Sequence, residues 1–343
     1  MRPFTFALGT LLSCLGITTA TATAATAHSY HIVRSYRLGG SGGWDYLTMD
    51  PVSQRLFIGR QDRVMVVNPS NGSIVGMIPG FDRAHGVALD DADGKGFATS
   101  GGDASVITFD LKTLKVLGRT HVDNDDDAIV FDPATRRVFT FNGDAHTASV
   151  LSASSGHRIG TIQLGAKPEF GVTDGHGRLY VNLESSDQIA EIDGVGMTVS
   201  RKWSTGPCHS PAALAIDRIH HLLFSGCRNQ TMVISDIRQG KVIAEVPVGR
   251  GVDAARYDPA TSLAFASARD GTMTVIREES PTSFGVVQTV ATKFGARTMA
   301  LDEQTHEIYT VSADFVPDAT NQGDKHRHLP LVPGSFTLLV LRP

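Results

Sequence analysis

Three side chains that could transfer protons precede short apolar runs of the chain. These are His85, Glu169 and His209. An imidazole or a carboxyl group held beside a bound substrate can act as a general acid or base. None of the three belongs to a local catalytic signature such as H-E-x-x-H, so a hydrogen-bonded loop histidine is the competing interpretation for both histidines. The sequence leaves catalysis open.

A run of carboxylates suggests a metal site. Asp125, Asp126 and Asp127 end the run Asp-Asn-Asp-Asp-Asp. Hard oxygen ligands of this kind could hold Ca²⁺ or another divalent cation. The spacing differs from the D-x-D-x-D-G pattern of helix-loop-helix calcium sites, and an acidic run in a loop is typical of a solvated surface. No cofactor is required by the sequence, and a bound cation is a hypothesis.

Arginines occur in several loops, and their forked donors suit a carboxylate or phosphate ligand. Pairing with nearby carboxylates such as Asp253 and Asp270 is the alternative. We therefore expect a small anionic molecule or a protein partner to bind these loops. The candidate ligand-binding residues are Trp44, Arg83, Asp253, Arg269 and Arg297.

Seven apolar runs that each end in aspartate must position these residues. The aspartates lie 40 to 44 residues apart, at Asp50, Asp90, Asp132, Asp174, Asp217, Asp258 and Asp302. A period of this length with short β-rich runs is typical of a propeller. We predict an all-β, seven-bladed β-propeller in which an N-terminal strand (32–38) completes the last blade beside 336–341, and the ring closes without an open edge.

One face of such a propeller carries the candidate residues. Loops that precede the first strand of a blade, and loops between its second and third strands, surround the mouth of the central channel. The candidate residues come from these two classes of loop. The sequence therefore predicts that they converge at the channel mouth.

The N-terminal residues 1–27 are typical of a cleaved signal peptide, with Arg2, an apolar stretch and the A-x-A pattern of Ala25-Thr26-Ala27. We expect a periplasmic or secreted protein that does not span the membrane. The mature residues 28–343 form a single predicted domain. A long loop at 313–335, which contains Lys325-His326-Arg327-His328, is a candidate lid over the channel mouth.

Charge and cysteine content narrow the possibilities further. Lys and Arg total 31 against 35 Asp and Glu, which argues against a nucleic-acid partner. Cys208 and Cys227 are the two cysteines of the predicted mature chain. Two thiols in an oxidising compartment favour a disulfide, and the predicted hairpin between them places them almost opposite each other.

The repeat resembles the YVTN-repeat (YncE-like) family of periplasmic seven-bladed β-propellers. Tyr180-Val181-Asn182 and Leu263-Ala264-Phe265-Ala266-Ser267 carry the resemblance, although the literal Tyr-Val-Thr-Asn string is absent. The resemblance implies an exported propeller. The wider superfamily includes lactonases, quinoprotein subunits and a nucleic-acid-binding protein, so it does not specify an activity.

Two functional interpretations follow. The first is an exported binding or interaction module whose ligand or partner is engaged at the channel mouth. The alternative is a metal-assisted, lactonase-like hydrolase or isomerase with its site in the central channel. The second rests on analogy with other propellers.

Overall fold

The computed structural model describes residues 29–316 and 330–343, together with Met1 and Pro3. The predicted signal peptide and the centre of the predicted long loop, with its Lys-His-Arg-His cluster, lie outside the described residues. Both stay predictions, as does the location of the protein. In the part of the chain that is described, no helix is long and apolar enough to cross a membrane.

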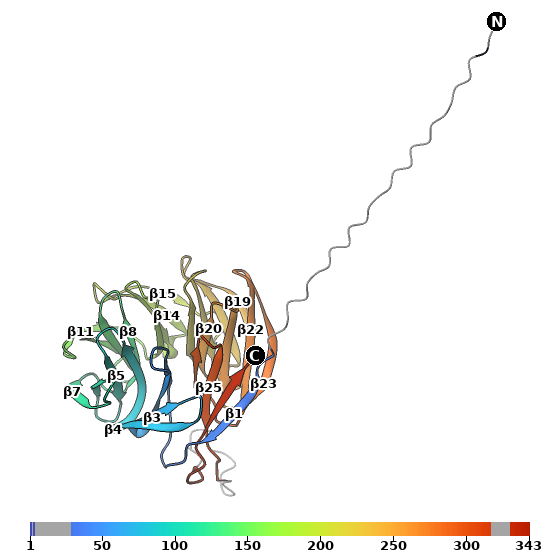
Figure 1. The fold of residues 1–343 in the computed structure, drawn as a ribbon. Coiled ribbons are helices and arrows are strands. Elements are labelled where there is room, and N and C mark those ends of the chain that lie inside the picture. The colour runs from blue at the N-terminus through green and yellow to red at the C-terminus, as the bar shows by residue number, and fades with distance from the viewer. Residues whose placement is uncertain (2, 4–28, 317–329) are drawn as a thin grey trace.

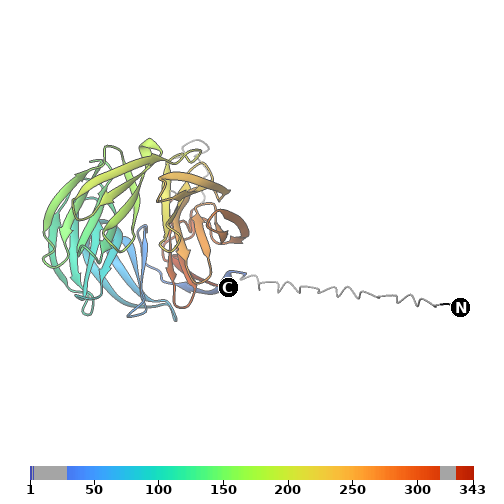
Figure 2. The same cartoon turned by 90° about the horizontal axis from the view of Figure 1, so that it is seen from above.

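Antiparallel sheets arranged around an axis make up the molecule (Figure 1 and Figure 2). The first sheet contains β2 (Leu47–Asp50), β3 (Arg55–Asn68), β4 (Ser73–Asp90), β5 (Lys95–Ser100), β6 (Ser105–Asp110) and β7 (Val116–His121). The second contains β8 (Asp126–Asp132), β9 (Arg137–Asn142), β10 (Thr147–Ser152) and β11 (Arg158–Gln163). The third contains β12 (Pro168–Thr173), β13 (Arg178–Leu183), β14 (Gln188–Asp193) and β15 (Thr198–Ser204), with a 3-10 turn at Glu184–Ser186.

The remaining sheets belong to the C-terminal part of the chain. The fourth contains β16 (Pro211–Asp217), β17 (Leu222–Cys227), β18 (Thr231–Asp236) and β19 (Lys241–Pro247). The fifth contains β20 (Val252–Asp258), β21 (Leu263–Ala268), β22 (Thr272–Ser280) and β23 (Ser283–Ala291). The sixth contains β1 (His31–Arg37), β26 (Thr337–Arg342), β25 (Glu307–Ser312) and β24 (Met299–Asp302).

The prediction of seven blades is wrong, because the described residues form six sheets. The first two sequence repeats share one six-stranded sheet. Its long strands β3 and β4 continue through segments expected to be loops, and Gln61 pairs with Ala84 between them. β3 pairs with β2 through its first half and with β4 through its second, while β4 also pairs with β5. Extended backbone around Gln61 in β3 and Ala84 in β4 therefore joins the first two sequence repeats into one sheet.

Closure by the N-terminal strand is confirmed. β1 pairs antiparallel with β26, from His31 opposite Arg342 to Arg37 opposite Thr337. In Figure 1 the blue β1 lies beside the red C-terminal strands. The pairing covers the strand edge of β26 that would otherwise be open.

A circle of first strands surrounds the axis. In contact order these are β2, β4, β8, β12, β16, β20 and β24, and β24 contacts β2 again. Each contains or directly precedes one of the seven repeat aspartates. The carboxylates of these aspartates accept hydrogen bonds from the turn that follows, as Asp50 does from the Val52 and Ser53 amides at 3.0 Å. The repeat aspartate therefore ends the strand and fixes the tight turn.

Aromatic side chains at one matched position of the second strands fill the space between sheets. All are buried, and they are Phe57, Phe97, Phe139, Tyr180, Phe224, Phe265 and Tyr309. Each large ring contributes apolar area that a single sheet cannot bury alone. Packing between neighbouring sheets thus holds the first strands in place around the channel.

Candidate functional site

One residue per repeat, five positions before the repeat aspartate, faces the channel mouth. We call this set the channel ring, and its members are Asp45, His85, Asp127, Glu169, Ala212, Asp253 and Arg297. Six of the seven carry an ionisable side chain. Several of the residues predicted as catalytic or ligand-binding therefore share one structural position, a regularity readable in the sequence once the repeats are aligned on their aspartates.

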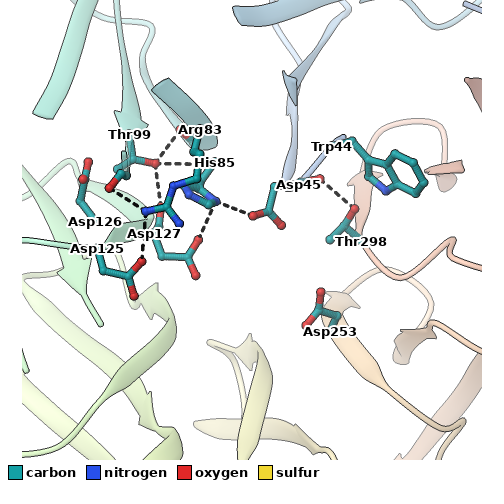
Figure 3. A network of polar contacts seen from close by, with 12 residues as sticks. Trp44, Asp45, Arg83, His85, Thr99, Asp125, Asp126, Asp127, Asp253 and Thr298 are labelled. Atoms are coloured by element: carbon teal, nitrogen blue, oxygen red, sulfur yellow. Dashed lines mark hydrogen bonds and ion pairs between the residues drawn. The ribbon is translucent and has the colours of Figure 1, made fainter. Parts of the chain in front are cut away.

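His85 connects two carboxylates of the channel ring (Figure 3). Its Nδ1 lies 2.6 Å from Oδ2 of Asp45 and 3.3 Å from Oδ1 of Asp127. Burial alone would lower the pKa of His85, but the hydrogen bond to Asp45 and the charge of Asp127 raise it to about 9. His85 is therefore a cation at neutral pH, and its Nδ1–H donates to Asp45.

Arg297 joins the other side of Asp45 to Asp253. Its Nε donates to Oδ2 of Asp253 at 2.6 Å, and an Nη atom lies 3.6 Å from Oδ1 of Asp45. Thr298 fixes the backbone at this point, because its hydroxyl donates to the Asp45 carbonyl at 2.8 Å. The channel ring is thus continuous from Asp127 through His85, Asp45 and Arg297 to Asp253.

Glu169 is held by an arginine from another loop. Arg228, which follows β17, donates to Oε1 of Glu169 at 3.1 Å and to Oε1 of Glu184 at 2.6 Å. Glu184 also lies 3.6 Å from Nζ of Lys167. Because Ala212 has no functional group, Arg228 is the cation that this part of the mouth supplies.

The channel ring contains four carboxyl groups and two cationic side chains, so its cations cannot neutralise all of its carboxylates. Burial and the charge of Asp45 raise the pKa of Asp127 to about 7. Burial and the charge of Asp127 hold the pKa of Glu169 well above its usual range, and burial also raises that of Asp253 against the pull of Arg297. Asp127 is therefore poised to take up or release a proton near neutral pH, and the pKa values of Glu169 and Asp253 are shifted in the same direction.

An aromatic and arginine layer lies directly beneath the channel ring. Tyr46 and Phe170 face each other across the channel with ring centroids 5.2 Å apart. The guanidinium of Arg256 lies over the Phe170 ring at 5.4 Å and donates to the Leu47 carbonyl at 3.4 Å. The mouth is therefore a cup with a floor. Beyond it, a cavity of 210 Å³ is lined by residues of β2, β20 and β24.

This floor was not predicted from the sequence, although the aligned repeats contain a signal for it. Arg256 occupies a position where the other repeats carry Thr48, Ala88, Val130, Val172, Ala215 and Ala300. Tyr46 and Phe170 likewise stand where most repeats carry glycine, alanine or threonine. Large or charged residues at positions otherwise filled by small ones indicate side chains that extend into the channel.

Trp44 does not line the cup. It is 7% exposed and packs against Phe315 and Phe336 between sheets, at centroid distances of 6.2 and 5.5 Å. The Trp44 side chain points away from the Asp45 carboxylate, as Figure 3 shows. Phe315, in the described part of the predicted long loop, covers Trp44.

The three carboxylates of the predicted acidic run also point to different places. Asp125 lies 3.7 Å from Arg83, while Asp126 turns inward and accepts the Ser100 amide at 3.1 Å. Asp127 alone joins the channel ring, so the three carboxylates do not converge on one point. A different group of ligand atoms, from Asp45, His85 and Asp127, lies within 4.8 Å of one another and could hold a divalent cation.

The other predicted residues lie outside the channel ring. His209 is largely exposed and its Nδ1 lies 2.7 Å from Asp187. Arg83 donates to the Gly101 carbonyl at 2.9 Å. Arg269 has no ion pair within the described residues. Arg228 and Arg297 are already engaged by carboxylates, which favours the pairing alternative over free anion-binding sites for these two side chains.

The predicted disulfide between Cys208 and Cys227 is confirmed, with Cα atoms 5.5 Å apart. Both cysteines are buried. The bridge joins the segment before β16 to the end of β17, one residue from Arg228. It therefore anchors the loop that delivers Arg228 to Glu169.

Proton binding gives the fold a pH dependence, and we expect lower stability at pH 9 than at pH 5. Burial raises the pKa of Asp126 from 3.8 to about 7, so the folded state binds this proton more tightly and loses stability as pH rises from about 4 to 7. Asp127 acts in the same direction. The contribution of His85 is complete below about 6.5 and is lost as pH rises through about 9.

Urea unfolding at pH 5, 7 and 9 measures this dependence. The Asp126→Asn variant should show a shallower decline between pH 5 and 7 than the unaltered protein. Stability that rises over this range, or an Asp126→Asn profile parallel to that of the unaltered protein, would show that the buried carboxyls do not titrate as described.

Comparisons with known proteins support the fold and nothing finer. No family model matches the chain, and no curated protein matches it. Among solved structures, 1803 chains match. One of them, described as "Crystal Structure of Mitotic Checkpoint Complex", aligns with a TM-score of 0.75 at 12% identity, over 98% of this chain and 99% of that chain. At this identity the likeness shows a β-propeller fold, which commonly serves interaction modules.

Proposed function

We propose that this chain is an exported binding propeller whose channel mouth takes a positively charged group of its ligand or protein partner. The observation that carries the proposal is the convergence of Asp45, Asp127, Glu169 and Asp253 at one mouth, where His85, Arg228 and Arg297 are already paired with carboxylates. A cation that enters the cup relieves repulsion among carboxyls that burial has partly desolvated. The buried disulfide agrees with an oxidising compartment, and the signal-like residues 1–27 support export.

The cup selects for an ammonium or guanidinium group on a narrow stem. Tyr46 and Phe170 form an aromatic floor against which methylene groups pack, and the Arg256 guanidinium already lies over the Phe170 ring, so the carboxyls above supply the attraction for a cation. A small polyamine and a lysine side chain of a protein segment offer the same chemistry. The experiment must therefore distinguish these two sources.

Calorimetric titration with spermidine, with a lysine-rich peptide and with a sugar acid tests the proposal. We expect one or both cationic probes to bind and the sugar acid not to bind. Binding of spermidine identifies a small ligand, while binding of the peptide alone identifies a protein partner. Binding of the anion alone would contradict the proposal.

A charge-matched comparison makes the test specific. Glu169→Gln and Asp253→Asn should each weaken cation binding by about tenfold, which is roughly 1.4 kcal/mol. Asp144→Asn removes an exposed carboxylate on a neighbouring loop and should leave the affinity within about twofold. Equal effects from all three variants would indicate attraction by overall charge and no specific cup.

A second candidate function is a metal-assisted, lactonase-like hydrolase or isomerase. The observation that favours it is the group formed by Asp45, His85 and Asp127, with Glu169 in the same cup as a carboxyl whose pKa is raised. A carboxyl with a raised pKa can act as a general acid or base. Lactone turnover that requires added Mn²⁺ or Ca²⁺ and is lost in Glu169→Gln would support this candidate over binding alone.

A further inference from the structure

A second group of ligand atoms lies at the opposite end of the first strands from the channel ring. Asp217 ends β16, His220 lies in the turn to β17, and Glu278 comes from β22 of the next sheet. One ligand atom of each lies within 4.8 Å of the others. Nδ1 of His220 is 2.6 Å from Oδ2 of Asp217 and 2.7 Å from Oε1 of Glu278.

Two of these residues depart from the pattern of the other repeats. The position of His220, three after the repeat aspartate, holds a hydroxyl residue in four of the other repeats and Asp93 or Gly177 in the remaining two; the hydroxyl residues are Ser53, Thr135, Thr261 and Thr305. The hydroxyls of Thr135 and Thr305 donate to their own aspartates. The position of Glu278 holds Leu111, Ala153, Gly194 and Ile237 in other sheets, with the same backbone hydrogen bond to the neighbouring turn. A histidine and a glutamate thus replace a hydroxyl and a small or apolar side chain at adjoining positions.

Each carboxylate uses one oxygen for the fold and points the other at the same place. Oδ1 of Asp217 accepts the Ile219 amide at 2.8 Å, and Oε2 of Glu278 accepts the Tyr257 hydroxyl at 2.6 Å. Such outer hydrogen bonds orient the carboxylate ligands of metal sites. Tyr257 and the Ile219 amide therefore act as an orienting second layer.

Burial makes this arrangement costly without a cation. Asp217 is 1% exposed and Glu278 is 6% exposed. Oε1 of Glu278 is buried and forms no hydrogen bond of acceptable geometry, although His220 lies beside it. One Nδ1 proton cannot serve two carboxylate oxygens, so one of the two buried charges is left without a full partner.

We propose that Asp217, His220 and Glu278 form a binding site for a zinc-like divalent transition metal. An imidazole nitrogen with two carboxylate oxygens is a ligand set that Zn²⁺ accepts at about 2.0–2.2 Å, and tetrahedral geometry needs the donors only about 3.3 Å apart. His220 has a side chain 39% exposed, so it can move outward and leave a fourth position open to water. The metal would link the sheet of β16–β19 to the sheet of β20–β23.

Titration of chelator-treated protein with Co²⁺ and Zn²⁺ tests the proposal, with Asp127→Asn present throughout to remove the candidate group of the channel ring. We expect one equivalent of Co²⁺ to give visible d–d absorption, which Zn²⁺ abolishes by displacement. We also expect Zn²⁺ to raise the melting temperature. Absence of the Co²⁺ spectrum or of bound Zn²⁺ would overturn the proposal, whatever the outcome for cation binding in the cup.

Matched variants separate this site from histidine–aspartate pairing in general. His220→Ser introduces the residue type found at Ser53, and Glu278→Gln keeps the volume of the side chain; each should weaken Zn²⁺ binding by at least about tenfold. His306 is the control, because its Nδ1 lies 2.7 Å from Asp258 without a third ligand in the described residues. His306→Ser should keep full binding. Retained binding in both Glu278→Gln and His220→Ser, or equal loss in His306→Ser, would contradict the assignment.

Discussion

Replacement of Tyr30 by alanine is expected to lower the free energy of unfolding by about 3–5 kcal/mol. Tyr30 precedes β1, is 1% exposed and packs edge-on against Phe265 with centroids 4.9 Å apart. Its backbone also exchanges hydrogen bonds with Gln288, at 2.9 and 2.8 Å. The ring therefore anchors the N-terminal strand at the junction of the fifth and sixth sheets.

Loss of this anchor should affect closure of the propeller as well as local packing. Without Tyr30, β1 can fray from β26 and expose the edge of the sixth sheet. Hydrogen exchange of the β26 amides should accelerate in Tyr30→Ala. Tyr30→Phe keeps the ring and removes only the 3.1 Å hydrogen bond to the His306 carbonyl, so it should cost about 1 kcal/mol. Equal stabilities of the two variants would contradict the role of the ring as an anchor.

Replacement of Arg297 by methionine should cost roughly 2–3 kcal/mol at pH 7. Truncation of a fully buried ion pair typically costs about 3–5 kcal/mol, and the 29% exposure of the Arg297 side chain reduces that value. The variant leaves Asp45 and Asp253 close together without the cation between them. Urea unfolding provides the measurement.

Two further variants identify the cause of that loss. Arg178→Met breaks an exposed pair with Asp193, at 3.8 Å, and should cost less than about 1 kcal/mol. Asp253→Asn added to Arg297→Met should recover part of the stability, because it removes the charge of Asp253, which has lost its partner, while Asp45 keeps His85. If Arg297→Met is as mild as Arg178→Met, Arg297 does not hold the channel ring together.

The repeat period predicted the propeller, the closing strand and the disulfide, but it did not predict the number of sheets. The period records where strands and turns recur. Whether 61–62 and 80–83 end a strand or continue it depends on the pairing of Gln61 with Ala84, which no local residue type specifies. Pairing between distant segments is decided by tertiary contacts, so it could not be predicted from repeat spacing.

The members of the channel ring were predicted as separate loop residues, and the ring itself was not. The predicted candidates His85, Asp127, Glu169, Asp253 and Arg297 belong to the channel ring, whereas Asp45 was not among the candidates and Trp44, which was, packs in the core. Trp44 and Asp45 point to different places, as do Asp126 and Asp127, and assignment to a loop does not separate such neighbours. Counting back five residues from each repeat aspartate would have selected the members of the channel ring.

The partners of the arginines could not be read from sequence. Arg228 reaches Glu169 across 59 positions of the chain, and Arg297 reaches Asp253 across 44. The sequence left anion binding and internal pairing open for these side chains. The distances observed favour internal pairing, and this outcome turned the expected ligand from an anion to a cation.

Proton release during ligand binding tests the central proposal most directly. A cation that enters the cup favours the charged form of Asp127, whose pKa burial raises to about 7, so binding at pH 6.5 should release protons to the buffer. Calorimetric titration of the tighter cationic probe in two buffers with different ionisation enthalpies measures the number of protons released, which should fall in Asp127→Asn. Proton uptake, or binding that releases no protons, would contradict a carboxyl-lined cation site at the channel mouth.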